Sequence, residues 1–280
     1  MLEAVAAETA PTIAGARLVD HLDALDAEGG LDLLVTLPRD LLASPALADQ
    51  HVEDLVDELI WLESHLPSRP KARSLFLSGA ANRLTRDGMV KLLGALRHVF
   101  PFAPGVEIAA DIDLSAWADD WASAAAFHGL TLARFSVAGD QVDTSHHAVA
   151  VLTEAVCALA DAGVTRFSID LASQVEGTPA AGAGLDALIR LGPERVGFAG
   201  EVGPVWARER LCMAGFDERA PGQFEHRPIS TTPLRSGRVE TSRIGLGPGA
   251  SWRIRNAHGT NPEAVAWRAA VVRGLARASE

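Results

Sequence analysis

LDLLVTLP at residues 31–38 is the first of six short apolar runs, each followed by a longer amphipathic run. Short runs of this kind are typical of buried strands, and the longer runs are typical of helices. Strand–helix units in series predict a parallel sheet with helices outside it, either an open (β/α)6 barrel or a doubly wound sheet. The expected strands are Leu31–Leu37, Ser74–Leu77, Val106–Ile112, Thr131–Val137, Thr165–Leu171 and Arg195–Ala199.

Helices are expected between and after these strands, and turns such as Leu191-Gly192-Pro193 carry residues that end helices. The pattern changes at Gly215, shortly before a stretch rich in Pro, Gly, Thr and Arg. We therefore expect one α/β domain over residues 1–214 and a C-terminal extension, ending in a helix, over residues 215–280. The expected helices are Asp49–His65, Arg86–Phe100, Ser115–His128, Ser145–Ala162, Gly184–Leu191, Val205–Ala214 and Asn261–Ala278.

Composition narrows the class of protein. The 280 residues are 48% hydrophobic and carry a formal net charge of −11, and this length suits one large α/β domain or two small ones. The negative charge argues against nucleic acid, which is bound mainly through basic faces. No apolar run reaches the roughly 18–20 residues that span a bilayer, and the N-terminus lacks the basic start of a signal peptide. We expect a soluble cytoplasmic protein that binds neither nucleic acid nor membrane.

The residues that most often bind metals are sparse. The two cysteines, Cys157 and Cys212, fit a reducing compartment, and both lie in apolar helical patterns that predict core positions. No zinc-type spacing occurs, and the adjacent His146 and His147 would point in different directions on a helix. We expect no metal site. Gly245–Gly249 lacks the Lys-Ser/Thr of a phosphate loop, so close backbone packing is the expected role.

Six segments resemble, in order and spacing, the motifs of one known family. They are VTLP at 35–38, LSGAAN at 77–82, EIAADID at 107–113, RFSV at 134–137, SIDL at 168–171 and GLGPGA at 245–250. Together they resemble the oxygen-independent coproporphyrinogen oxidases, which are HemN-type radical S-adenosylmethionine (SAM) proteins, and their heme-chaperone relatives. The resemblance covers about residues 31–276. It implies a partial (β/α)6 TIM-like barrel of the radical SAM type, with a C-terminal extension and helix.

The chain departs from that family where the iron–sulfur cluster is bound. Counting on from Pro38, the three cysteine positions hold Asp40, Ser44 and Leu47, whereas iron–sulfur clusters are held by cysteine thiolates. The Gly-Leu-Pro turn of the family is also missing after SIDL. The resemblance therefore implies an inherited scaffold without the cluster, and we expect no cofactor.

Carboxylates and arginines follow several of the expected strands. Residues two apart in a strand face the same way, so Asp111 and Asp113 share a face. The carboxyl ends of barrel strands surround the site, where carboxylates beside arginines suit proton abstraction and anion binding. An acid after a strand is also a common helix N-cap. The candidate catalytic residues are Asp111, Asp113, Asp140 and Asp170, and the candidate substrate-binding residues are Arg39, Asp40, Asn82, Arg83, Ser136, Arg219 and His226.

Two classes of function fit these features. The first is a cofactor-independent biosynthetic enzyme for a small charged metabolite. Here the resemblance implies a cluster-free relative from bacterial specialised metabolism, of the aziridine-forming type found in azinomycin-like pathways, in which an amine displaces a sulfate ester with the help of a small partner protein. The second is a non-catalytic tetrapyrrole-binding or scaffold protein. We also expect a homodimer or a protein partner, because Trp117, Trp121 and Trp206 are predicted to lie on helix surfaces, where large aromatic side chains often anchor interfaces.

Overall fold

The centre of the protein is one large sheet. The computed structural model describes residues 18–25, 30–138, 146–172, 179–198, 203–226 and 242–278. The strands are β1 (Leu31–Leu37), β2 (Ala72–Gly79), β3 (Phe102–Ile112), β4 (Leu132–Ala138), β5 (Arg166–Ala172), β6 (Arg195–Phe198), β7 (Phe216–Ala220), β8 (Gln223–His226), β9 (Ser242–Leu246), β10 (Ser251–Ile254) and β11 (Ala257–Thr260). They form an eleven-stranded sheet in the order β11-β10-β9-β1-β2-β3-β4-β5-β6-β8-β7.

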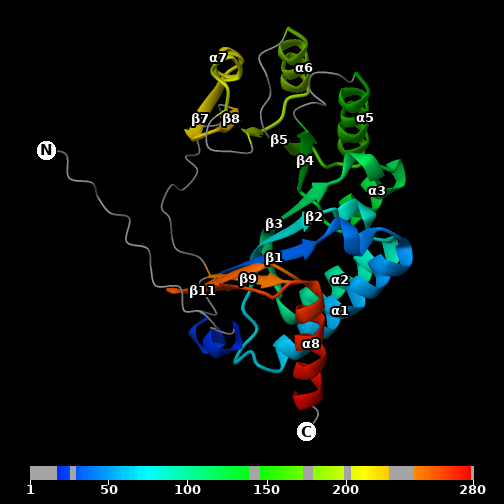
Figure 1. The fold of residues 1–280 in the computed structure, drawn as a ribbon, viewed down its shortest axis with the longest axis vertical. Coiled ribbons are helices and arrows are strands. Elements are labelled where there is room, and N and C mark those ends of the chain that lie inside the picture. The colour runs from blue at the N-terminus through cyan, green and yellow to red at the C-terminus, as the bar shows by residue number, and fades with distance from the viewer. Residues whose placement is uncertain are drawn as a thin grey trace, which may run out of the picture.

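The middle of the sheet is parallel and both ends are antiparallel. Strand β9 pairs in parallel with β1, and parallel pairing continues without interruption from β1 to β6. Strands β10 and β11 extend one end, and β8 and β7 extend the other, all in antiparallel pairs. Within the described residues β11 and β7 are separate edges, so the sheet is open and does not close into a barrel (Figure 1).

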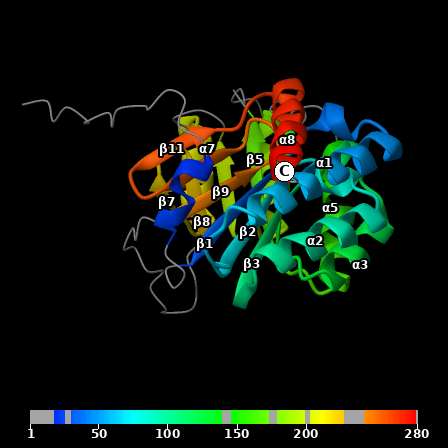
Figure 2. The ribbon, with the colours of Figure 1, turned by 90° about the horizontal axis from the view of Figure 1, so that it is seen from below.

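Helices alternate with the parallel strands. The 3-10 helices are η1 (Leu18–Ala24), η2 (Arg39–Leu42), η3 (Ala81–Arg83) and η4 (Leu114–Ala116). The α-helices are α1 (Pro45–Glu63), α2 (Arg86–Val99), α3 (Asp119–Phe127), α5 (His146–Asp161), α6 (Pro179–Arg190), α7 (Val205–Met213) and α8 (Ala264–Ala278). Figure 2 shows α1, α2, α3 and α5 together on one side of the sheet, with α8 beside α1. None of the helices in the described residues is long and apolar enough to cross a membrane.

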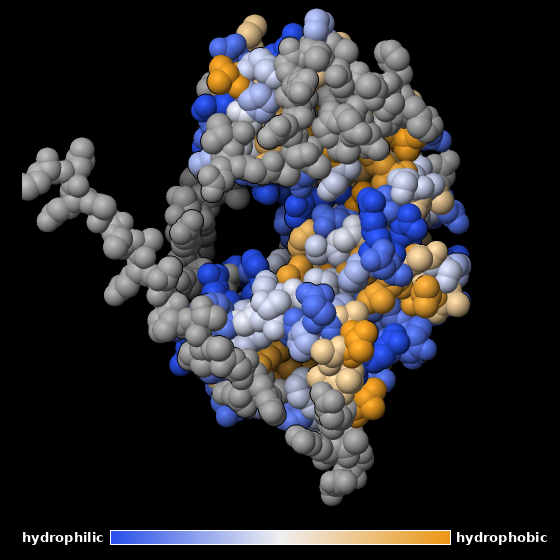
Figure 3. Space-filling view, viewed as in Figure 1, coloured by the Kyte–Doolittle hydropathy of each residue, from blue (hydrophilic) through white to orange (hydrophobic). Residues whose placement is uncertain are grey.

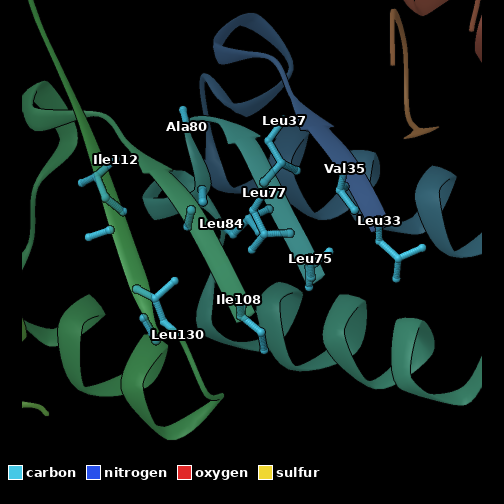
Figure 4. Close-up of a cluster of buried hydrophobic side chains, with 14 of the residues drawn as sticks. Leu33, Val35, Leu37, Leu75, Leu77, Ala80, Leu84, Ile108, Ile112 and Leu130 are labelled. Carbon is cyan, nitrogen blue, oxygen red and sulfur yellow. The ribbon is translucent and has the colours of Figure 1, made fainter. Parts of the chain in front are cut away.

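The two faces of the sheet differ in polarity because side chains alternate along each strand. In β1 the residues Leu31, Leu33, Val35 and Leu37 are at most 2% exposed, while the positions between them are half-buried. The buried set joins residues of the neighbouring strands and helices in one apolar core, and Figure 4 shows part of it on the side where the helices run. The opposite face of the sheet, which we call the open face, carries most of the polar side chains discussed below.

All six expected strands are present as β1 to β6, and the α/β fold with its parallel sheet is confirmed. The errors lie at the boundaries. Helix α1 begins at Pro45 rather than at residue 49, because the hydroxyl of Ser44 accepts the N–H of Leu47 and proline is favoured in the first turn. The segment expected to be a single helix from Ser115 is split into η4 and α3.

The C-terminal segment adds five strands that the sequence pattern did not reveal. Strands β7 and β8 follow β6, and β9 to β11 lie beside β1, so residues 215–280 contribute to both ends of the same sheet. The expected close packing of Gly245–Gly249 is confirmed. A Cβ atom at Gly245 would lie 2.3 Å from the carbonyl oxygen of Ser251, and one at Gly247, whose φ is +89°, would lie 2.6 Å from Oγ1 of Thr36.

Two expectations about side-chain exposure are wrong. Trp121 is 7% exposed, and Trp117 and Trp206 are partly buried against the core, because the apolar interior reaches their helices. The prediction of an interface through exposed tryptophans therefore loses its premise at Trp121, which is the buried one of the three. Cys157 and Cys212 are exposed rather than in the core, because each lies on the outward side of its helix. On the face seen in Figure 3, exposed hydrophobic residues form small separate groups among hydrophilic ones.

Candidate functional site

Asp113 is the most fully bonded of the predicted site residues. Its side chain is 1% exposed, and its two oxygens accept from Arg39 Nη2 at 2.9 Å and from Arg83 Nε at 2.8 Å. The backbone N–H and the hydroxyl of Ser115 also donate to it, so Asp113 is the N-cap of η4. Burial opposes ionisation, but the bonds from Arg83 and Ser115 and the charge of Arg39 outweigh burial and hold the pKa of Asp113 below its ordinary value.

Asn82 completes this network through the backbone. Its Oδ1 accepts the N–H of Asp113 at 2.8 Å, and its Nδ2 donates to the carbonyl oxygens of Asp113 and Ala116. Asn82 is 7% exposed, so its polar atoms are satisfied by protein alone. The four predicted residues Arg39, Asn82, Arg83 and Asp113 do come together after β1, β2 and β3. Their bonds tie three loops to one another, which fits an anchoring role.

Asp111 lies two residues before Asp113 and on the open face. Its Oδ2 accepts from the backbone N–H of Gly79 at 2.9 Å and from Oγ of Ser78 at 3.2 Å, both at the end of β2. Its Oδ1 is 3.6 Å from Nε of Arg134 on β4. Burial raises the pKa of Asp111, assisted by the nearby charge of Asp170 and opposed by the Gly79 N–H, Arg134 and Ser78. A carboxyl with a raised pKa is better suited to exchanging protons near neutral pH.

Arg134 joins Asp111 to a second carboxylate. Its Nη2 lies 2.7 Å from Oδ2 of Asp170 on β5, and its guanidinium carbon lies 4.5 Å from the centre of the Phe76 ring. We call Asp111, Arg134 and Asp170 the Asp–Arg–Asp triad. Their side chains are 21%, 32% and 27% exposed, so all three can be reached by a dissolved molecule. Two carboxylates and one guanidinium give the ionised triad a net charge of −1.

The position of Asp170 depends on Gly197. In the pairing of β5 with β6 these two residues are partners, and a Cβ atom at Gly197 would lie 2.3 Å from Oδ1 of Asp170. The same Cβ would lie 3.0 Å from Nε2 of Gln223 on β8. The absence of a side chain at Gly197 therefore makes room for the Asp170 carboxylate. Ser136, which pairs with Asp170 in register, is exposed at the end of β4.

The remaining predicted residues lie apart from the triad or outside the described residues. Asp40 is exposed on η2. Arg219 is on β7, where it is 3.7 Å from Glu225 and 3.9 Å from Asp217, and His226 ends β8 with its ring packed edge-on against Phe216. Asp140 falls outside the described residues, so its prediction stays open.

Sequence reasoning missed three residues that shape the triad. Arg134, Phe76 and Gly197 were not among the candidate residues, although Arg134 was part of a quoted motif. A usable signal was present, because an arginine in the middle of an otherwise apolar buried strand needs a partner on a neighbouring strand. Recognising the partner required the strand order and register, which place Arg134 beside Asp111 and one pleat from Asp170.

The positions equivalent to the cluster cysteines do not suit an iron–sulfur cluster. Asp40 offers an exposed carboxylate, Ser44 uses its hydroxyl to cap α1, and Leu47 is an exposed aliphatic side chain with no ligand atom. In the part of the chain that the structure describes, no three His, Cys, Asp or Glu side chains are grouped as metal ligands would be. The donor set therefore does not fit the cluster that radical SAM proteins bind.

Comparison with known proteins supports the fold. No protein-family model matches the sequence, and no curated protein sequence matches it. Among solved structures, coproporphyrinogen III oxidase (HemN) from Escherichia coli, which is described as a radical SAM enzyme, superposes with a TM-score of 0.76. The two chains share this fold. The alignment covers 91% of this chain and 72% of HemN at 16% identity, a level that establishes the architecture and leaves the activity open.

Proposed function

We propose that this protein is a cofactor-independent enzyme whose Asp–Arg–Asp triad binds a small molecule through an ammonium group and removes a proton from it. The triad carries the proposal because two reachable carboxylates meet there with a net negative charge near the carboxyl ends of β3 and β5, and burial raises the pKa of one of them, Asp111. A cationic substrate is attracted to such a site, whereas an anion is repelled. Asp113 is too fully bonded by Arg39, Arg83 and Ser115 to exchange a proton with substrate.

The specific reaction that we propose is intramolecular displacement of a sulfate ester by an amine, which closes an aziridine ring. An ammonium proton passes to the carboxylate of Asp111, and the freed lone pair attacks the carbon that carries the sulfate ester, which closes the three-membered ring. The bond from that carbon to the ester oxygen breaks, and sulfate leaves with the bonding electrons. The ring nitrogen then loses its second proton to solvent. The guanidinium of Arg39, 63% exposed and bonded to Asp113 through one of its nitrogens, is suited to stabilise the leaving sulfate.

Support for Asp111 as the proton acceptor comes from its surroundings. Its raised pKa makes it a stronger base than an ordinary aspartate, and hydrogen bonds from Gly79 and Ser78 hold one oxygen in place. Because the carboxylate must be ionised to accept a proton, the rate rises with pH through this raised pKa. We therefore expect the acidic limb of the pH–rate profile to lie above the usual range of an aspartate, which is about 3.9.

The test uses 2-aminoethyl hydrogen sulfate, the simplest molecule with an amine next to a sulfate ester. Released sulfate and aziridine are followed by ion chromatography and NMR. We expect Asp111→Asn and Asp170→Asn to keep the thermal midpoint while turnover falls by about 10²–10⁴-fold. Asp113→Asn is the matched control, because it makes the same substitution two residues away. It should lower the thermal midpoint, whereas the two triad variants should lower turnover at an unchanged midpoint.

Two results would count against the proposal. Unchanged turnover in both folded variants would show that the triad does no chemistry. A heme titration that gives a Soret band, with heme binding unchanged by Asp111→Asn, would favour the alternative of a tetrapyrrole-binding protein.

The turnover assay also includes a protein partner, the purified product of the adjacent gene, because the resemblance implies that such reactions use one.

A further inference from the structure

The open face carries a row of apolar side chains beside the triad. Leu34 pairs in register with Phe76, Phe76 with Ala109, and Ala109 with Leu132, so the four lie side by side across β1, β2, β3 and β4. We call these four residues the apolar row. Leu34, Phe76 and Leu132 are half-buried and Ala109 is 8% exposed.

The apolar row does not belong to the hydrophobic core. The core lies on the helix side of the sheet and includes the neighbours of the row along each strand, such as Leu33, Leu75 and Ile108. Within the described part of the chain, none of the four row residues forms or packs against that core. Exposed apolar side chains are unremarkable singly, but a contiguous set on a sheet face next to charged groups is characteristic of a binding surface.

The row and the triad are fixed relative to each other by the strands. Asp111 follows Ala109 by two residues and Arg134 follows Leu132 by two, so both lie one pleat closer to the carboxyl ends of the strands, and Asp170 lies one pleat further on. Two residues along a strand span about 6.6 Å. Arg134 bridges the two levels, because its guanidinium lies over Phe76 while it bonds Asp170.

We infer that the substrate is an amine with an apolar body, in which two or three carbons separate the nitrogen from that body. This inference rests on the proposed function and names the class of its substrate. The ammonium group binds the Asp–Arg–Asp triad, and the apolar body covers Ala109 and Leu132, the members of the row that lie one pleat from Asp111 and Arg134. The net charge of −1 at the triad selects an ammonium over a carboxylate, and the spacing of about 6.6 Å sets the length between the two parts.

The experiment compares four probes by saturation-transfer NMR and calorimetry on the full chain. They are 2-phenylethylamine, its neutral analogue 2-phenylethanol, the anion 3-phenylpropionate, and butylamine, which lacks the ring. We expect 2-phenylethylamine to bind most tightly, by about tenfold over each of the others, because it alone satisfies both the row and the triad.

Variants separate the two parts of the site. Leu132→Asn should weaken 2-phenylethylamine binding by about tenfold and leave butylamine unchanged, whereas Leu34→Asn, at the far end of the row, should change the binding of both little. Asp111→Asn should remove the preference for the amine over the alcohol. Ile60→Asn is the matched control, because Ile60 is 53% exposed on α1 and lies on the helix side; it should change neither.

Each alternative outcome points to a specific error. If 2-phenylethylamine and butylamine bind equally, the apolar row does not select substrate, and the inference fails while the proposed function stands. If the amine and the alcohol bind equally, the triad does not recognise ammonium, and both fail. If the row variants lower the thermal midpoint more than Ile60→Asn does and leave binding unchanged, the row packs against protein and the inference is overturned.

Discussion

Glu58 provides the most quantitative test of this structure. It lies on α1 with its residue only 6% exposed, and its oxygens accept from the N–H of Gly247 at 2.7 Å and from Nδ2 of Asn261 at 3.2 Å. Burial raises the pKa of Glu58 from 4.5 to about 7, although the bonds from Gly247 and Asn261 oppose the rise. The nearby Trp267 also opposes it, although its indole N–H makes no hydrogen bond of good geometry.

The raised pKa has a defined sign for stability. A group whose pKa is higher in the folded state stabilises the fold below its unfolded pKa and loses that contribution as pH rises through the folded pKa. For Glu58 the loss occurs between about pH 4.5 and 7. A difference of one unit between the folded and unfolded pKa changes the free energy of unfolding by about 1.4 kcal/mol, so the rise at Glu58 corresponds to about 3 kcal/mol.

The assay is urea denaturation of the native protein and Glu58→Gln from about pH 4.5 to 8. The glutamine cannot ionise, so the free energy of unfolding of the native protein should fall by about 3 kcal/mol more than that of the variant over this range. The variant has its own constant penalty, because its amide NH₂ meets that of Asn261, and only the slope against pH is compared. Glu154→Gln, at an exposed position on α5, is the control and should keep the native slope. Equal slopes for the native protein and Glu58→Gln would refute the reasoning.

Three further outcomes follow from the packing. Asp113→Asn should lower the free energy of unfolding by about 2–4 kcal/mol in thermal and urea melts, because it leaves buried donors and arginine charges without a carboxylate; a loss below about 0.5 kcal/mol would contradict the anchoring role. Gly197→Ala should cut turnover without comparable loss of stability, because its Cβ displaces the Asp170 carboxylate, and a crystal structure with Asp170 unmoved would count against it. Light scattering should show a homodimer or a complex with a partner, since Phe127 is 84% exposed at the end of α3, and Phe127→Ser should shift the equilibrium toward monomer; a monomer under all conditions would oppose this.

Much of the fold could be predicted because its strands are buried on one face and separated by helices with clear end signals. The run at Leu31–Leu37 was located to the residue. The strands after Gly215 could not be, since they are four or five residues long and β9, which joins β10 and β11 to the sheet, pairs with β1 at the other end of the chain. Strands this short contain only about two periods of alternation, and their pairing becomes visible only when the whole sheet is assembled.

The site was predicted in part for a related reason. Counting in twos along β3 placed Asp111 and Asp113 on one face, but the pattern does not distinguish their surroundings. Asp113 meets arginines from two loops, whereas Asp111 meets Arg134 across the sheet. That difference depends on which strands are neighbours and on where the loops after β1 and β2 fold back. Local sequence gives little information about which strands are neighbours, and almost none about where these loops fold back.

The ion pair between Arg39 and Asp113 helps to hold the loop that follows β1 in place. Arg39 begins the loop in which the resemblance places the ligands of an iron–sulfur cluster, and its guanidinium is held at the end of β3 by Asp113. Ser44 in the same loop caps α1. The loop is thus held by contacts within the protein, namely the Arg39–Asp113 ion pair at one end and the Ser44 cap of α1 at the other. Because Asp111 lies two residues before Asp113, the same ion pair fixes the end of β3 beside Asp111, which is the preorganisation that the proposed proton transfer requires.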